Sequence, residues 1–286
     1  MSKPILIFLA GAIRACYGLS ESFADMFLRA VDFGPAGAIV NRAYAGRALP
    51  AKFNKYAAVI VTGSLSMVTQ RSKWSGELQD ALRRALDQNV PLLAVCYGHQ
   101  LLADALGGVV GYHPEGRELG THVISLYEEA WSHPLLKGLP ARFKANLNHS
   151  QTVLEPPKEA RVLARSAHDP FQILAYGDRV LSLQFHPEFD RRVMEAFVSY
   201  PPPSKKEALA APLATAPLSP NGLQAESGLQ SGNGLQSGDG LQPGDGLQPD
   251  NGLKLGAPLE DTPYSVSILR AFVDAARAGA PFPTGA

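Results

Sequence analysis

The residue of this sequence best placed for chemistry is Cys96. An apolar run, residues 91–95, leads directly into it, and apolar residues then repeat at helical spacing until a glycine pair at 107–108. This pattern predicts a strand that turns sharply into a helix at Cys96. A side chain on such a turn projects above the carboxyl edge of a sheet, where the first amides of the helix can stabilise negative charge. The sequence therefore predicts a thiolate nucleophile.

A thiol with the ordinary pKa of about 8.5 is only slightly ionised at neutral pH, so a nucleophilic cysteine needs a base. His186 and Glu188 stand together at the end of a predicted strand. We expect His186 to take the thiol proton and Glu188 to accept a hydrogen bond from the other ring nitrogen, which fixes the tautomer. Attack on a carbonyl creates an oxyanion, and the backbone amides of Gly63 and Tyr97 are placed to donate to it. The implied reaction is acyl transfer through a thioester.

An α/β fold must position these residues. Continuous apolar strands alternate with amphipathic helices in the first part of the chain, which is typical of a parallel sheet covered on both faces. We expect strands at 5–10, 38–40, 57–61 and 91–95, and helices from residue 23, at 75–89, after 96 and at 191–199. Ligands of such sheets bind at the carboxyl ends of the strands, where Gly63 and Cys96 both fall.

After residue 108 the pattern changes to strands with few helices between them, which predicts an antiparallel section. These strands are expected at 121–127, 143–147, 161–167, 171–176 and 179–185. Gly177-Asp178 between the last two indicates a two-residue hairpin turn.

Two separated motifs together resemble the class I glutamine amidotransferases. Residues 96–100 read Cys-Tyr-Gly-His-Gln, and residues 185–188 read Phe-His-Pro-Glu. The first is similar to the nucleophile motif of that family and the second to its distant His-Pro-Glu motif, in the same order. Residues 116–120, Gly-Arg-Glu-Leu-Gly, and 148–150, Asn-His-Ser, make the chain resemble stand-alone members similar to the amidotransferase domain of GMP synthase.

The resemblance implies a flavodoxin-like class I amidotransferase fold and a glutaminase reaction. Cys96 would attack the side-chain amide of glutamine and release ammonia, and water activated by His186 would hydrolyse the γ-glutamyl thioester. Gln100 resembles the position that contacts the substrate, and His149 with Ser150 resembles the loop that meets its α-amino or carboxylate end.

The sequence departs from the family pattern at two places. Ala94 replaces a glycine of the family, and Gly63-Ser64 lacks the fuller Gly-Gly-Pro form of the oxyanion loop.

A low-complexity repeat separates the last helix from the rest of the domain. Gly-Leu-Gln or Gly-Leu-Lys recurs every six residues between 222 and 254. One leucine per repeat buries too little apolar surface to offset about 1–2 kcal/mol of backbone entropy per residue, so we expect disorder over 201–261. A hexapeptide β-helix is the competing interpretation. Residues 1–200 then form the amidotransferase domain, and a helix at 262–280 packs back onto it.

Composition excludes several classes of partner. The 286 residues are 45% hydrophobic and carry 26 basic and 26 acidic side chains, so we expect no nucleic-acid or membrane binding. Two cysteines are too few for a disulfide framework and indicate a cytoplasmic protein, with Cys16 structural. The histidines outside the two motifs show no metal-ligand spacing, and we expect neither a metal nor another cofactor.

Three functions remain open. The first is a glutamine amidotransferase that passes ammonia to a separate acceptor-activating synthase, since no phosphate-binding loop is present in the sequence. The second is a γ-glutamyl hydrolase or peptidase that acts on another γ-glutamyl compound. The third is a catalytically inactive binding or regulatory module.

Overall fold

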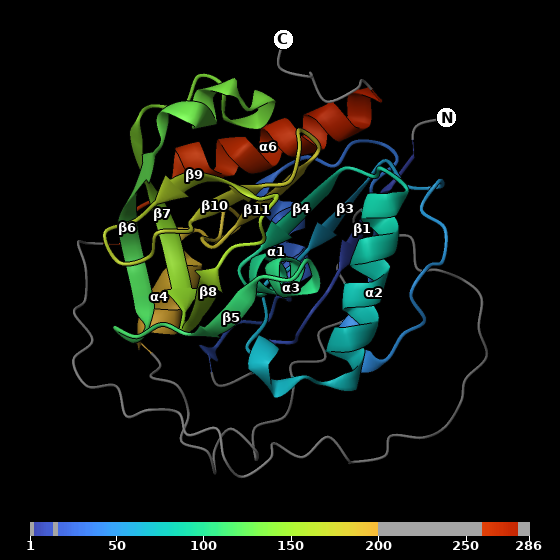
Figure 1. The fold of residues 1–286 in the computed structure, drawn as a ribbon, viewed down its shortest axis with the longest axis horizontal. Helices are drawn as coiled ribbons and strands as arrows, with labels where there is room; N and C mark the ends of the chain where they lie inside the picture. Colours follow the sequence, from blue (N-terminus) through green and yellow to red (C-terminus); the bar gives the residue numbers. More distant parts are fainter. Residues whose placement is uncertain (1–2, 14–16, 200–258, 280–286) are drawn as a thin grey trace.

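A central sheet organises the protein. The computed structural model describes residues 3–13, 17–199 and 259–279, and these residues form a nine-stranded sheet with helices on both faces (Figure 1). Five neighbouring strands run parallel, and in spatial order they are β2 (Ala38–Asn41), β1 (Ile5–Phe8), β3 (Ala58–Val61), β4 (Leu92–Val95) and β11 (Val180–Leu183). The predicted α/β fold class is confirmed.

Both faces of the parallel strands are buried, which explains their continuous apolar sequences. In β1, Ile5 and Ile7 belong to one core cluster and Leu6 and Phe8 to the other. The first cluster includes residues of the helices α1 (Phe23–Ala30), α4 (Arg191–Ser199) and α6 (Pro263–Ala278), and the second includes residues of α2 (Lys73–Asp87) and α3 (Tyr97–Ala105). Figure 1 shows α2 and α3 on the side of the sheet that faces the viewer.

Local signals set the ends of two helices. The Ser22 hydroxyl accepts a hydrogen bond from the Asp25 backbone amide and the Asp25 carboxylate accepts one from the Ser22 amide, a capping box at the start of α1. Pro263 occupies the first turn of α6, and Gly279 follows its end with a left-handed φ of 60°.

The antiparallel section extends the same sheet beyond β11. Its strands follow in the order β10 (Ile173–Ala175), β9 (Arg161–Arg165), β6 (Glu118–Leu126) and β7 (Arg142–His149). The predicted hairpin at Gly177-Asp178 forms between β10 and β11, but the prediction of a two-residue turn is wrong. The Tyr176 amide bonds to the Val180 carbonyl, so three residues form the loop, because the Arg179 carbonyl instead accepts a hydrogen bond from Leu92 of β4.

Two strands were not expected from the sequence. β5 (Val109–Tyr112) and β8 (Gln151–Glu155) form a separate antiparallel pair beside α3. Short 3₁₀ turns complete the described structure at Ala43–Ala45, Val68–Gln70, Glu128–Ser132 and Pro134–Leu136. Over the described ranges, no helix has the length and apolar character that crossing a membrane requires.

The last helix packs against the sheet. Ile268, Leu269 and Phe272 of α6 are fully buried in the first core cluster. Nearly all of the predicted disordered insertion lies outside the described residues, as does Cys16. Residues 259–261, the last three of the predicted insertion, are described: the Glu260 carboxylate accepts a hydrogen bond from Lys144 at 2.5 Å, and the Glu260 backbone amide donates to the Thr121 hydroxyl at 3.2 Å.

Candidate active site

Cys96 stands at the sharp turn that the sequence predicts. It follows β4 directly, precedes the first residue of α3 and has φ = 52° and ψ = −102°. A positive φ is uncommon for a residue with a side chain and costs on the order of 1–3 kcal/mol. The conformation is held from both sides, because the Cys96 amide donates to the Leu183 carbonyl at 2.7 Å and its carbonyl accepts from Gln100 at 3.1 Å. The sulfur lies 3.9 Å from the Asn148 carbonyl oxygen.

Glycine lets α3 lie directly on the sheet. A Cβ atom added at Gly98 would stand 2.9 Å from both Cβ and the carbonyl oxygen of Val61 in β3. The first turn of the helix therefore sits closer to the strand than a side chain permits. The Tyr97 side chain points to α2, where its hydroxyl donates to Ser75 at 2.9 Å, so only the backbone of Tyr97 remains at the turn.

His186 and Glu188 form a buried pair next to Cys96. The Nδ1 atom of His186 lies 2.8 Å from Oε1 of Glu188, and both residues are at most 2% exposed. This contact leaves Nε2 as the ring nitrogen that is available to the sulfur. Burial lowers the pKa of His186, but the charges of Glu188 and Cys96 and the hydrogen bonds to both raise it overall to about 10. His186 is thus held as an imidazolium, the partner that a thiolate requires.

Gly63 lies against both of these side chains. A Cβ atom added there would stand 2.7 Å from Cε1 of His186 and 3.6 Å from Cβ of Cys96. The ends of β3, β4 and β11 thus bring Gly63, Cys96 and His186 into contact, as the sequence predicts for the carboxyl edge of a parallel sheet.

The His186 ring is fixed by aromatic packing and by β7. The Phe189 ring stacks on the His186 ring with 3.8 Å between the ring centroids and 7° between the planes. The ring of Phe23 in α1 lies parallel to the His186 ring with 6.4 Å between the centroids. Asn146 accepts the His186 amide on its carbonyl at 2.8 Å and donates its side-chain amide to the Phe189 carbonyl at 2.9 Å. These contacts leave the ring little freedom to move.

Gln100, one turn into α3, is bonded within the protein. Its side-chain amide donates to the Gln151 carbonyl at 2.6 Å and to Oε1 of Gln184 at 3.0 Å, and the residue is 4% exposed. The neighbouring His99 is fully buried, and its Nδ1 lies 2.8 Å from the Ser182 hydroxyl. Burial lowers the pKa of His99 to about 3, so this ring is neutral and packs in the core.

His149 and Ser150 lie at the end of β7, directly after the residue whose carbonyl faces the sulfur. Both ring nitrogens of His149 have partners inside the protein, namely the Gln151 carbonyl at 3.0 Å and Oε2 of Glu118 at 2.9 Å. The Ser150 carbonyl accepts a hydrogen bond from His113 at 3.0 Å. The predicted substrate contacts of these residues remain predictions.

Asn146 is a supporting residue that sequence reasoning missed, and Glu118 and Asn148 stand in motifs quoted from the sequence without a role of their own. The two asparagines stand at alternate positions of β7, and Asn146, which lies between Ala145 and Leu147 and is fully buried, must find hydrogen-bond partners. That pattern could have identified them as structurally important. Their partners, however, come from elements distant in the sequence.

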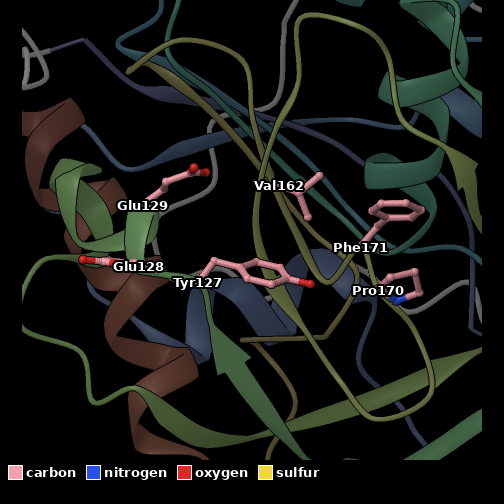
Figure 2. Close-up of a pocket in the computed structure, with 6 residues that line it drawn as sticks. All are labelled: Tyr127, Glu128, Glu129, Val162, Pro170 and Phe171. Carbon is pink, nitrogen blue, oxygen red and sulfur yellow. The ribbon is translucent and has the colours of Figure 1, made fainter.

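A hollow lies away from these residues. It measures about 610 Å³ and is lined by Tyr127, Glu128, Glu129, Val162, Pro170 and Phe171 (Figure 2). None of the predicted site residues lines it. Figure 2 shows the Tyr127 ring extending toward Pro170 while the Glu128 side chain points away. In the described part of the chain, no group of three or more His, Cys, Asp or Glu side chains could hold a metal ion.

Comparison with known proteins identifies the family to which this sequence belongs. Residues 38–198, more than half of the chain, match the family described as "Glutamine amidotransferase class-I". The chain is 36% identical over 159 residues to GMP synthase [glutamine-hydrolyzing] of Aeropyrum pernix, a match that covers 54% of this chain and 28% of that protein. It is 32% identical over 142 residues to Gamma-glutamyl peptidase 4 of Arabidopsis thaliana, which covers 49% of this chain and 57% of that one.

A solved structure supports the fold. The glutamine amido transferase of Methylobacillus flagellatus superposes with a TM-score of 0.56 at 23% identity, covering 70% of this chain and 75% of that one. The chain therefore spans from about a quarter to little more than half the length of the two curated relatives, and three quarters of the solved structure.

Proposed function

Because this chain belongs to the class I glutamine amidotransferase family, we propose that it hydrolyses the side-chain amide of glutamine through a γ-glutamyl thioester on Cys96. His186 is the acid and base in this proposal and Glu188 orients it. The products are glutamate and ammonia, and the ammonia passes to a separate acceptor.

In the first half-reaction, the Cys96 thiolate forms a bond to the amide carbon while the thiol proton resides on His186. The backbone amides of Gly63 and Tyr97 are proposed to donate to the oxyanion of the tetrahedral intermediate. His186 then gives its proton to the leaving nitrogen, the C–N bond breaks and ammonia departs. Glu188 remains a carboxylate and stabilises the imidazolium throughout.

In the second half-reaction, His186 takes a proton from water and the resulting hydroxide adds to the thioester carbon. The C–S bond breaks, glutamate leaves, and the proton on His186 again balances the Cys96 thiolate. The same residue serves as acid in one half-reaction and base in the other, which matches a ring whose second nitrogen is bound to Glu188.

The observation that carries the proposal is the arrangement around Cys96. A cysteine with a strained backbone at a strand-to-helix turn lies against an imidazolium paired with a buried glutamate, and a glycine stands beside both side chains. A cysteine that only packs in the core has no need of a costly φ or of a buried charged partner.

A γ-glutamyl hydrolase or peptidase is the second candidate. The Arabidopsis relative named Gamma-glutamyl peptidase 4 favours it. The two candidates share the acyl group and the thioester and differ only in the leaving group, which is ammonia in one and an amine or peptide in the other.

We also propose a partner and a domain organisation. The Aeropyrum relative is more than three times as long as the matched segment, since the match covers 28% of it, which favours a separate synthase that accepts the ammonia. Residues 1–200 and the helix at 262–280 are proposed to form one catalytic domain interrupted by the insertion at 201–261. A reduced Cys96 is consistent with a cytoplasmic enzyme.

The test is covalent capture of the nucleophile. The protein is incubated with a glutamine-mimicking chloroketone and digested for mass spectrometry, and hydrolysis of glutamine and of γ-glutamyl peptides is measured in parallel. We expect an adduct on Cys96, and Cys96→Ser should lose turnover while keeping the melting temperature.

The outcomes separate the three functions. Preference for γ-glutamyl peptides over glutamine selects the second candidate. Hydrolysis by Cys96→Ser at the wild-type rate would refute the mechanism, and a folded wild-type protein that neither hydrolyses these compounds nor reacts with the chloroketone would be a binding or regulatory module.

A further inference from the structure

A second buried histidine–carboxylate pair lies beside Cys96. Glu118 is the first residue of β6 and His149 the last residue of β7, and the two stand directly opposite each other in the antiparallel pairing. Side chains in this register share one face of the sheet. Nε2 of His149 lies 2.9 Å from Oε2 of Glu118, and both side chains are at most 2% exposed.

The hydrogen-bond partners determine the charge of this pair. Nδ1 of His149 faces the Gln151 carbonyl at 3.0 Å, and a carbonyl can only accept, so Nδ1 carries a hydrogen. Oε2 of Glu118 also receives the side-chain amide of Gln172 at 2.9 Å, so this oxygen is already an acceptor. The raised pKa of His149 and the lowered pKa of Glu118 favour the arrangement with this hydrogen on Nε2, in which His149 is an imidazolium facing a carboxylate.

Electrostatics agree with this assignment. Burial lowers the pKa of His149, but the hydrogen bond and charge of Glu118, with smaller contributions from Asp169 and Cys96, raise it above its ordinary value. Burial raises the pKa of Glu118, but His149 and a hydrogen bond to Ser166 lower it overall. His149 also interacts electrostatically with two further histidines, and it contributes to lowering the pKa of His99 and of His113.

The pair lies next to the nucleophile. The carbonyl of Asn148, the residue before His149, is 3.9 Å from the Cys96 sulfur. Both ring nitrogens of His149 are occupied, so the ring has no hydrogen left to donate to a substrate. What it retains is its positive charge, which interacts electrostatically with Cys96.

We propose that Glu118 is a positioning residue that holds His149 as a permanent imidazolium, and that this second positive charge stabilises the Cys96 thiolate together with His186. This inference rests on the proposed function, because it concerns the ionisation of the same nucleophile, Cys96. The thiolate would then face two imidazoliums, each paired with its own buried glutamate. Loss of either positive charge would then weaken the electrostatic stabilisation of the thiolate.

The test measures the ionisation of Cys96 without any substrate. The rate of alkylation by iodoacetamide is followed from pH 4 to pH 10 in the full chain carrying Cys16→Ser, which leaves Cys96 as the only thiol, since the sequence has two cysteines. Glu118→Gln removes the carboxylate and should move the midpoint of the alkylation profile upward by about one pH unit, so that the rate well below the midpoint falls about tenfold.

Matched variants isolate the charge. Glu118→Asp keeps the carboxylate and should restore most of the shift, whereas His149→Gln should reproduce it. Glu115→Gln removes the carboxylate of a side chain that is 75% exposed, three residues away, and should leave the profile unchanged. Overlapping profiles for wild type and Glu118→Gln would overturn the proposal.

A second measurement needs no variant that has to fold. Nitrogen-15 NMR of the wild-type histidine rings at pH 7.5 should show one further imidazolium besides His186, assigned to His149, with both nitrogens protonated. A neutral His149 ring at that pH would equally overturn the proposal. Because neither experiment uses turnover, failure of the protein to hydrolyse glutamine would reject the proposed function and leave this inference standing or falling on its own data.

Discussion

Gly63→Ala adds one methyl group where β3 ends against the proposed catalytic pair. The added Cβ would lie 2.7 Å from Cε1 of His186, and ordinary contacts of this kind begin at about 3.4 Å. The ring must therefore retreat by about 0.7 Å. It cannot do so easily, because Phe189 stacks on it at 3.8 Å and Glu188 binds its Nδ1 at 2.8 Å.

The consequence should appear in both catalysis and stability. A displacement approaching 1 Å of a catalytic group costs about a hundredfold in rate, or about 2.7 kcal/mol of transition-state stabilisation. Overpacking a buried site costs about 1–3 kcal/mol of folding free energy. We expect kcat for glutamine hydrolysis to fall about a hundredfold while the protein still unfolds in one cooperative transition. The assay is steady-state ammonia release beside a urea unfolding curve.

Gly76→Ala is the matched control for this prediction. Gly76 lies within α2, and a Cβ atom added there has no neighbour within 4 Å. The same substitution should leave kcat unchanged and stabilise the protein by up to about 1 kcal/mol, because alanine favours a helix more than glycine does. If Gly63→Ala retains the wild-type kcat and the wild-type rate of chloroketone labelling, the contact between Gly63 and His186 is not part of the catalytic geometry.

Two further predictions rest on individual contacts, and a third concerns the low-complexity insertion. The pKa of His186 is raised from 6.5 to about 10 in the folded protein, so protonation of this ring stabilises the fold fully below pH 6.5 and the free energy of unfolding should fall as the pH rises toward 10. The dependence of this free energy on pH should be weaker in Glu188→Gln. Equal pH dependence in the two proteins would refute the pairing of His186 with Glu188. Gly98→Ala should destabilise the protein by about 1–3 kcal/mol in urea titrations, because the added Cβ meets Val61 at 2.9 Å; no loss relative to Gly76→Ala would contradict the close packing of α3 on β3. Replacing residues 204–258 with a flexible Gly/Ser linker should leave the melting temperature and glutaminase activity nearly unchanged, and insoluble protein would show that the segment is needed by the domain.

The two glutamate–histidine pairs near Cys96 differ in how the chain forms them. His186 and Glu188 are two residues apart, so a single strand end delivers both. Glu118 and His149 come from different strands, and their contact depends on the register of β6 against β7. A shift of one residue would turn one of these side chains to the other face and separate them.

The structure corrects the hairpin prediction for a related reason. Gly177-Asp178 is a strong local signal for a two-residue turn, but β11 also pairs in parallel with β4. The Arg179 carbonyl accepts the Leu92 amide in that pairing, and the loop grows to three residues. A neighbouring strand that is distant in the sequence thus overrides the local signal.

The sequence by itself determined the parallel part of the sheet, the turn at Cys96 and the prediction that a histidine and a glutamate, His186 and Glu188, act with this cysteine. These features rest on short-range patterns, namely apolar runs, helical spacing and glycine stops, which act between residues close in the chain. Only the tertiary structure decided which groups surround the sulfur: Asn146 behind His186, the Asn148 carbonyl beside Cys96, and the charged pair of Glu118 and His149. Their positions follow from strand register and the packing of two sheet faces, and no local pattern encodes those distances.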